Sequence, residues 1–435
     1  MRKLTRAHSD EIIASPPRPI QTAGETFADA SQIDLIAPLG DGNLRLALWD
    51  GMRETISSSI LCKGQTYVPV RLQPGLMRDM TLPSRCQPHG GTRTFLWDIC
   101  SLIKKFTGLD NKSVAVLSRI VLLTAIVDAV PMALTLLIVG PDVGRAKQLL
   151  TLLRCLCRHP LRLTGVTRSA FTSLPSGMQF SYLISQPVFS KSLKNILDTA
   201  SSRDEKILVH GNLIDLFGVQ VLHDWSGLAA DDSWPSHPIQ ISMPPIGRVL
   251  PILDLDSQRR ITNEYQAKLL SFRRANLGVA RRLQFDASAL TWPLRSTAHA
   301  LAAATPDDPQ LQGEVFDLLK DTDENIRNER FIDLDCVTVE AVLVAAHESA
   351  GGVIYISELA KIAQQILHGR GAESSTQPGL LGKRLKALDF STQRDTRGSK
   401  LLLTSTTIAH ARQLARDLDV VAREPAAKAQ AQPNR

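Results

Sequence analysis

The fold of this chain is decided by the stretch Ala133-Leu-Thr-Leu-Leu-Ile-Val-Gly140-Pro-Asp-Val-Gly144-Arg-Ala-Lys147. Its first half is a continuous apolar run, which predicts a strand buried in a parallel sheet. A loop that begins with glycine follows, and residues 147–157 predict a strongly apolar helix. A strand, a Gly-led loop and a helix form the context in which backbone N–H groups and a helix N-terminus bind phosphate. The stretch therefore predicts an α/β fold with a candidate phosphate-binding loop.

The loop has this context without the usual chemistry. In the phosphate-loop pattern G-x-x-x-x-G-K-[ST], Gly140 takes the first glycine position. Arg145 stands at the second glycine, Ala146 at the lysine and Lys147 at the hydroxyl residue. Arg145 blocks the close backbone approach that glycine allows, and Ala146 supplies no charge to phosphate. A shifted register with Gly144 and Lys147 leaves two extra residues between them. We expect a structural loop, with Gly140, Gly144, Arg145 and Lys147 as the candidates for nucleotide binding.

The next strand lacks the acidic residue that would hold Mg²⁺ and activate water. It reads Ser181-Tyr-Leu-Ile-Ser185-Gln186-Pro187, with Ser185 at the expected carboxylate position. ATP and Mg²⁺ are the ligands that such a site would hold, but both of its chemical groups are missing. We therefore expect no hydrolysis unless a partner subunit supplies them. The pair His223-Asp224 is of interest as an acid and a base, although a surface loop explains it better.

Composition places the chain among soluble globular proteins. It has 435 residues, of which 43% are hydrophobic and 21% charged, enough for two to four domains. Six scattered cysteines exclude a disulfide scaffold. The most apolar stretch, residues 121–139, contains Asp128 and Pro131, which argues against a membrane span. No secretory signal opens the sequence. We expect a cytoplasmic protein that does not bind membranes.

Helical and extended patterns alternate through the middle of the chain. Helices are predicted over residues 95–106 and 113–130, and further strands over 181–185, 206–210 and 218–222. This alternation favours a mainly parallel sheet covered by helices on both faces. Residues 257–284 predict a long basic amphipathic helix. Its arginines could serve a neighbour's phosphates, face DNA, or form an ordinary solvated face, and the sequence leaves these alternatives open.

The order of these segments resembles a known family. The strand–loop–helix at 134–157, the segment 161–171, the Ser-Gln-Pro strand end at 185–187 and the segment 238–245 carry the resemblance. They look like P-loop ATPases of the AAA+ class from plasmid, phage and mobile-element replication proteins, which are related to virus-type helicases. The resemblance implies a P-loop-type sheet flanked by helices, followed by a helical lid. Those proteins carry lysine and aspartate where this chain has Ala146 and Ser185, so the resemblance implies the fold rather than the activity.

The C-terminal segment has the pattern of a winged helix. A helix over 337–346, a strand over 353–355, a helix capped by Ser357 and a helix over 379–388 are predicted. A hairpin over 391–404 with a basic tip follows. This order resembles the winged-helix fold, and the resemblance implies that the third helix enters the major groove of DNA while the hairpin touches the flanking backbone.

The charge of the chain supports a DNA partner for this segment. Residues 353–416 hold ten basic and four acidic residues, a net charge of +6, whereas the whole chain carries +7. Lysine and arginine on such a surface neutralise phosphates and release counterions. The alternative is a winged helix that binds protein. The predicted DNA contacts are the basic residues of the third helix and the hairpin: Lys383, Arg384, Lys386, Arg394, Arg397 and Lys400.

Together these features predict a DNA-binding, AAA+-like protein without an active nucleotide site, which acts in replication or maintenance of mobile-element, plasmid or phage DNA. The alternatives are an active ATP-dependent motor with an unconventional phosphate loop, and a non-catalytic scaffold that forms homo-oligomers. The predicted segments are a flexible tail over 1–31, a β-rich element and linker over 32–93, an AAA+-like domain over 94–250, a helical lid over 251–332, a winged helix over 333–420 and a tail over 421–435.

Overall fold

The computed structural model describes residues 18–38, 43–225, 238–245, 249–348, 352–372 and 376–418, together with positions 234, 247 and 420. Both predicted tails lie largely outside this range. The chain forms two compact units, one within Met1–Ala287 and Ser296–Leu318 and the other within Ser288–Arg295 and Leu319–Arg435. The segment expected as a lid, 251–332, is therefore shared between the two units.

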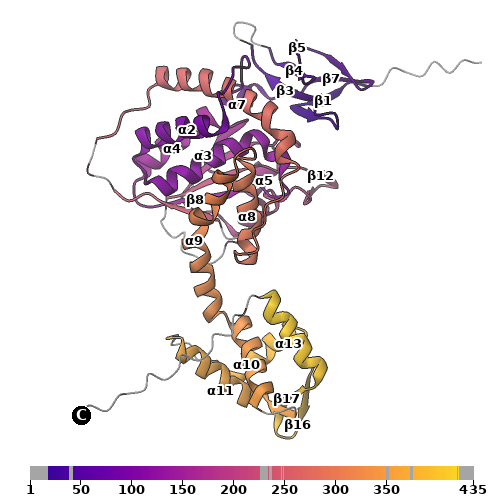
Figure 1. Ribbon diagram of the computed structural model, residues 1–435. Coiled ribbons are helices and arrows are strands. Elements are labelled where there is room, and N and C mark those ends of the chain that lie inside the picture. The colour runs from indigo at the N-terminus through magenta and orange to yellow at the C-terminus, as the bar shows by residue number, and fades with distance from the viewer. Residues whose placement is uncertain are drawn as a thin grey trace, which may run out of the picture. The chain divides into compact units, whose positions relative to one another are not determined.

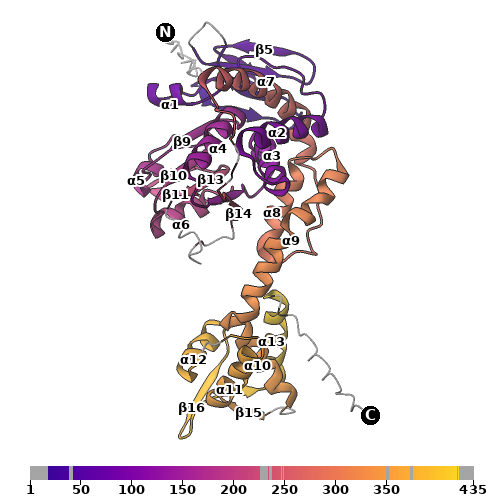
Figure 2. The ribbon, with the colours of Figure 1, turned by 90° about the vertical axis from the view of Figure 1, so that its left-hand side faces the viewer.

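A five-stranded sheet forms the centre of the first unit (Figure 1 and Figure 2). Its strands are β8 (Thr135–Val139), β9 (Pro160–Leu163), β10 (Ser181–Gln186), β13 (Gln220–Asp224) and β14 (Ile239–Ser242). They lie in the order β14-β8-β13-β10-β9, and every neighbouring pair is parallel. Because the strands are parallel, the loops after β8, β10, β13 and β14 all lie at one edge of the sheet. The prediction of a parallel sheet is confirmed.

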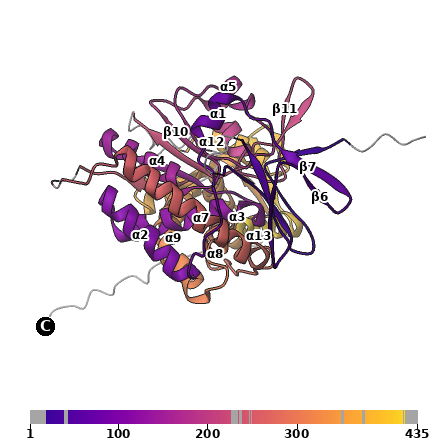
Figure 3. The ribbon, with the colours of Figure 1, turned by 90° about the horizontal axis from the view of Figure 1, so that it is seen from above.

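Helices cover both faces of this sheet. On one face, α5 (Arg168–Thr172) and α6 (Lys191–Thr199) share a hydrophobic cluster with Leu137, Ile184 and Leu222 of the strands. On the other face lies α4 (Val143–Leu156), which packs against α2 (Thr92–Thr107) and α7 (Leu255–Ala280). α3 (Asn111–Ile126), with the short 3-10 helix Val127–Ala129 after it, packs against both α2 and α7 (Figure 3). Two helices follow α7, α8 (Trp292–Ala303) and α9 (Pro309–Ile332).

The strand predicted over 206–210 forms, but outside the parallel sheet. It is β11 (Ile207–Val209), and it pairs antiparallel with β12 (Asn212–Ile214) in a hairpin of two strands. The turn between them is His210-Gly211, and both residues have positive φ, 47° and 81°. Two consecutive residues with positive φ make a tight turn that matches the twist of a hairpin. The chain therefore reverses at once instead of crossing back to the sheet.

Two small sheets precede the central one (Figure 1). The first holds β1 (Ile20–Thr22), β7 (Gln65–Pro69) and β6 (Ile60–Cys62), and the second β2 (Gly24–Thr26), β3 (Gln32–Ile36), β4 (Arg45–Trp49) and β5 (Glu54–Ser57). All pairs are antiparallel except β1 with β7. A short helix, α1 (Pro74–Asp79), follows. The predicted β-rich element is confirmed, and it begins earlier than expected because β1 and β2 lie in the predicted flexible segment 1–31.

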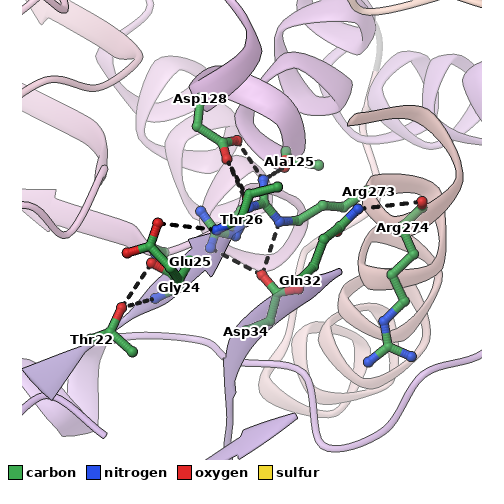
Figure 4. A network of polar contacts seen from close by, with 12 residues as sticks. Thr22, Gly24, Glu25, Thr26, Gln32, Asp34, Ala125, Asp128, Arg273 and Arg274 are labelled. Atoms are coloured by element: carbon green, nitrogen blue, oxygen red, sulfur yellow. Dashed lines mark hydrogen bonds and ion pairs between the residues drawn. The ribbon is translucent and has the colours of Figure 1, made fainter. Parts of the chain in front are cut away.

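Buried ion pairs attach the second small sheet to the helices (Figure 4). Arg273 of α7 is 1% exposed, and its guanidinium binds Asp34 of β3 at 2.9 Å and Asp128 after α3 at 2.9 Å. Arg158 also donates to Asp34, at 3.2 Å. Next along α7, Arg274 pairs with Glu54 of β5 at 2.5 Å. These two arginines of the predicted basic helix therefore face the protein interior, and neither is available to DNA or to a phosphate.

The second unit has the predicted order of elements. These are α10 (Leu334–Glu348), β15 (Gly352–Tyr355), α11 (Ile356–Gly369), α12 (Pro378–Ala387), β16 (Thr392–Asp395), β17 (Gly398–Leu403) and α13 (Ser405–Asp417). The three strands form an antiparallel sheet in the order β15-β17-β16. Leu359, Leu381, Leu385 and Leu401 lie in its buried core.

Two details of this unit differ from the sequence analysis. The N-cap of α11 is Tyr355, so Ser357 lies inside the helix instead of capping it. A further helix, α13, closes the unit after Thr404, whose hydroxyl accepts from the Thr407 N–H at 3.2 Å. In the part of the chain that the structure describes, no helix has the length and apolarity needed to cross a membrane.

Candidate functional site

The loop between β8 and α4 supplies its own anion. Asp142 is the N-cap of α4, and its carboxylate accepts a hydrogen bond from the backbone N–H of Arg145 at 3.0 Å. The N–H of Ala146 is bonded to the Asp142 carbonyl at 3.0 Å, and that of Val143 to Pro141. A phosphate at a helix N-terminus needs these N–H groups and the positive end of the helix dipole. Here the Asp142 carboxylate takes that place, and its negative charge opposes a second anion.

Gly140 makes room for protein backbone. Its φ is +131°, and a Cβ added there would lie 2.5 Å from the carbonyl oxygen of Met243. Met243 follows β14, and its N–H donates to the Val139 carbonyl at 2.6 Å. A side chain at position 140 would therefore collide with the segment after β14. The requirement for glycine is met by a close contact within the chain, as expected of a structural loop.

The two cations of the loop are also bound by the chain itself. Arg145 is 6% exposed, and its guanidinium donates to the Pro244 carbonyl at 2.6 Å. Lys147 lies on the exposed side of α4, with its ammonium 4.7 Å from the centre of the Trp225 ring. Gly144 is exposed in the first turn of α4, where it faces open space beside Asp142. The four candidate residues are thus on one loop and helix, but their side chains and backbone do not converge on a free position.

Ser185 belongs to a polar group that the sequence analysis missed. Its hydroxyl accepts from the indole N–H of Trp225 at 2.7 Å and shares a hydrogen bond with Nδ1 of His223 at 2.9 Å. His223 lies on β13 and is 0% exposed, so the interpretation of His223-Asp224 as a surface loop is wrong. The register that pairs Ser185 with His223 on neighbouring parallel strands brings them together. His223 directly follows the apolar strand residues Val221 and Leu222, and this continuation of the strand was the available signal.

The serine and the histidine of this group are buried, so they are not accessible to a substrate. Burial lowers the pKa of His223 below its ordinary value, the nearby Lys147 acts the same way, and Asp224 opposes them. The ring is therefore neutral at pH 7. Ser185 is 5% exposed, which leaves its hydroxyl no access to substrate. Among the described residues, no three or more His, Cys, Asp or Glu side chains gather as metal ligands would.

The basic residues of the second unit differ from those of the loop after β8 in what they contact. On α12, Lys383, Arg384 and Lys386 are exposed, and at the β16–β17 hairpin Arg394 and Arg397 are exposed as well. Within the described residues, no carboxylate lies within ion-pair distance of Lys383 or Lys386. The hairpin extends beyond the helices of its unit (Figure 2). The predicted DNA contacts therefore lie on one helix and one hairpin of a single unit, and the charges of Lys383, Lys386, Arg394 and Arg397 are directed to solvent.

Two of the six predicted DNA contacts are engaged in ion pairs. Lys400 binds Asp395 at 3.1 Å, and Tyr355 donates to the same carboxylate at 3.2 Å. The Lys400 ammonium and the Arg397 backbone N–H hold the pKa of Asp395 below its usual range. On α12, Arg384 lies 3.4 Å from Asp335 of α10. Lys400 thus pairs with Asp395 next to the turn of the hairpin, and Arg394 and Arg397, on either side of Asp395 in the sequence, are exposed.

No known protein family and no curated protein matches this chain. Among solved structures, the chain is similar to the apo A form of the NrS-1 C-terminal region at 11% identity and a TM-score of 0.36, over 86% of this chain and 97% of that one. A second structure of that region gives 12% identity and a TM-score of 0.35, over 86% and 96%. The Drosophila ORC bound to DNA gives 11% and 0.19, over 79% and 94%. These resemblances are distant, and the function proposed below rests on the residues of this chain.

Proposed function

We propose that this chain is a DNA-binding protein with an AAA+-like core whose nucleotide site is inactive, and that it acts in the cytoplasm in replication or maintenance of mobile-element, plasmid or phage DNA. The proposal assigns residues 94–250 to the core and 333–420 to a winged helix that contacts DNA. The observation that carries it is the contrast between cations bound within the chain at 140–147 and cations directed to solvent on α12 and the hairpin.

The exposed cations support binding to a polyanion. Lys383 and Lys386 lie on the same side of α12, since residues three apart on a helix are neighbours. Neither has a carboxylate partner among the described residues, so neither has to break an ion pair before it binds a phosphate. Each cation that neutralises a DNA phosphate releases a counterion, and the affinity then falls steeply with salt.

The loop after β8 supports an inactive nucleotide site. Binding of a triphosphate there would require Asp142 to leave the N-terminus of α4 and Arg145 to leave the Pro244 carbonyl. No lysine stands at the position of Ala146, and Ser185 offers a hydroxyl that already binds Trp225 and His223. An active motor that relies on Lys147 would have to detach its ammonium from Trp225.

The proposal is tested by fluorescence anisotropy of a labelled duplex titrated with the full-length chain at several salt concentrations. We expect saturable binding whose affinity falls as salt rises. The double substitution Lys383→Ala with Lys386→Ala should weaken binding at every salt concentration and reduce the salt slope by about two.

The matched control removes the same charge from the first unit, with Lys105→Ala and Lys191→Ala, both at exposed positions. This variant should bind DNA as the original chain does. Equal losses in the two variants, or no binding by the original chain at low salt, would contradict the proposal. Absence of binding would favour a protein-binding winged helix, whereas equal losses would favour DNA contacts spread over many exposed cations.

A further inference from the structure

We infer that the C-terminal unit recognises duplex DNA through its phosphates and does not read base sequence with α12. This inference rests on the proposed function, since it specifies how the proposed DNA partner is recognised. It follows from the side chains that the helix presents outward. Leu381 and Leu385 are 0% exposed and mark the inner side of α12. At 100° per residue, the opposite side holds Gly379, Leu380, Lys383, Lys386 and Ala387, each of them exposed.

This outward side has no hydrogen-bond acceptor in its side chains. Lysine offers three donors and no acceptor, and the side chains of glycine, alanine and leucine offer neither. Adenine and cytosine each present an amino group in the major groove, and a protein must supply an acceptor to read it. The side chains of asparagine, glutamine, aspartate and glutamate that supply one are absent from these five positions. The lysines can donate to guanine O6 and N7 as well as to phosphate. They are mobile point charges without a fixed pair of donors, so we expect them to favour the phosphates.

Arg384 is the one arginine of α12, and it lies at the margin of the outward side. Its guanidinium is 3.4 Å from the Asp335 carboxylate of α10. The other carboxylate oxygen of Asp335 is buried without a partner among the described residues. Reading guanine with both arms of Arg384 would remove the cation from a carboxylate that is already incompletely bonded. The Asp335 side chain is 32% exposed, so this pair is a modest restraint that favours Arg384 on Asp335 over base readout.

The hairpin adds donors of the same kind. Arg394 and Arg397 are exposed, and the single carboxylate of the hairpin, Asp395, is engaged by Lys400 and Tyr355. The Arg397 side chain would therefore approach DNA beside Asp395, whose charge Lys400 already neutralises. Contacts of this type fix the position of a protein on the duplex but carry no sequence information.

The test is selection by the full-length chain from a pool of duplexes with a randomised centre, followed by anisotropy on the recovered and on unrelated duplexes. We expect no enriched motif, and affinities that agree within about threefold with parallel salt dependence. An enriched motif that is bound more than about tenfold tighter than unrelated duplexes would overturn the inference. In that case Arg384→Ala and Gln377→Ala would show which side chain reads the bases. Arg384 is the arginine of α12, and Gln377 is the exposed amide that precedes this helix.

The failure of the inference differs from the failure of the proposed function. Sequence-selective binding overturns the inference and leaves the proposed function intact. Absence of binding to every duplex at low salt overturns the proposed function, and the inference with it.

Discussion

Two segments of this chain carry basic residues where phosphate is expected, and they differ in what already binds those residues. In the loop after β8, Arg145 donates to the Pro244 carbonyl and Lys147 lies on the Trp225 ring. On α12, Lys383 and Lys386 point to solvent without a carboxylate partner among the described residues. The residue types are similar, and only the second set is free to bind a ligand.

The difference shows that tertiary packing decides whether a basic side chain is free to bind a ligand. The loop after β8 is surrounded by the segment after β14 and by the residues after β13, which bind its arginine and its lysine. The α12 helix packs on one side only, through Leu381 and Leu385, so its other side stays open. Four substitutions test this contrast between internally bound and exposed groups.

The largest effect is expected where a cation is most deeply bound. Arg273→Met leaves Asp34 and Asp128 buried without their shared partner, and breaking a buried pair from one side costs about 3–5 kcal/mol. Urea unfolding at pH 7 measures the change. Arg259→Met is the matched control on the same helix, since the Arg259 side chain is 77% exposed. Comparable losses in the two variants would show that the buried network contributes nothing specific.

Gly140→Ala tests whether the loop glycine serves the fold or a ligand. At φ +131° and with a Cβ 2.5 Å from the Met243 carbonyl oxygen, alanine should reduce the free energy of unfolding by about 1–3 kcal/mol. Gly144→Ala is the control, because its position is helical and open, and it should stabilise the chain by about 0.5–1 kcal/mol. Thermal unfolding of the two variants gives the comparison, and a neutral Gly140→Ala would favour a ligand role for Gly140.

A buried histidine should make the first unit sensitive to mild acid. Burial, together with the charge of Arg158, lowers the pKa of His159 well below its ordinary value, and His159 bonds to the Met178 carbonyl at 2.9 Å. The unfolded chain takes up this proton below about pH 6.5, whereas the folded chain does not. Stability conferred by the neutral ring is thus complete above pH 6.5 and declines below it, by up to about 1.4 kcal/mol per pH unit.

The measurement is urea unfolding between pH 7.5 and 5 for the original chain and for His159→Asn, which tolerates the φ of 44° at this position. The difference between the two curves reports the single proton. Parallel curves across this pH range would contradict a neutral, buried His159.

The smallest effect on folding is expected on the hairpin. Arg397→Ala should leave the unfolding midpoint unchanged, because Arg397 is exposed. It should reduce the salt slope of DNA binding by about one, as expected for one lost phosphate contact. Anisotropy at several salt concentrations measures the slope. An unchanged slope would place the hairpin away from DNA.

Much of the fold is predictable from local patterns. The apolar run before Gly140 gives β8, and the leucines of α12 recur at helical spacing, so both elements follow from side-chain periodicity. The hairpin β11–β12 is an exception, because His210-Gly211 is not one of the common turn dipeptides. Its strand is predictable, but the partner of that strand is not.

The site is less predictable, because its outcome depends on contacts between distant segments. Met243 and Trp225 are far from the loop in sequence, and no local pattern shows that they bind near it. For some buried charged residues, the sequence pattern did indicate burial. Asp34 stands between Ile33 and Leu35, and Arg273 lies one turn from Leu269 and Leu277, so both charges fall on apolar faces. Charged residues within apolar patterns indicate buried ion pairs. The lysines of α12 lie on the side of the helix opposite the leucines, which indicates exposure to solvent.

The central claim is that this chain binds DNA without the use of nucleotide. It is tested most directly by titration of a labelled duplex with one preparation of the full-length chain, in Mg²⁺ at one fixed ionic strength with and without ATP, while released phosphate is measured. We expect salt-sensitive DNA binding, the same affinity in both conditions, and no phosphate release. DNA affinity that changes with ATP, or phosphate release that Lys147→Ala abolishes, would contradict it.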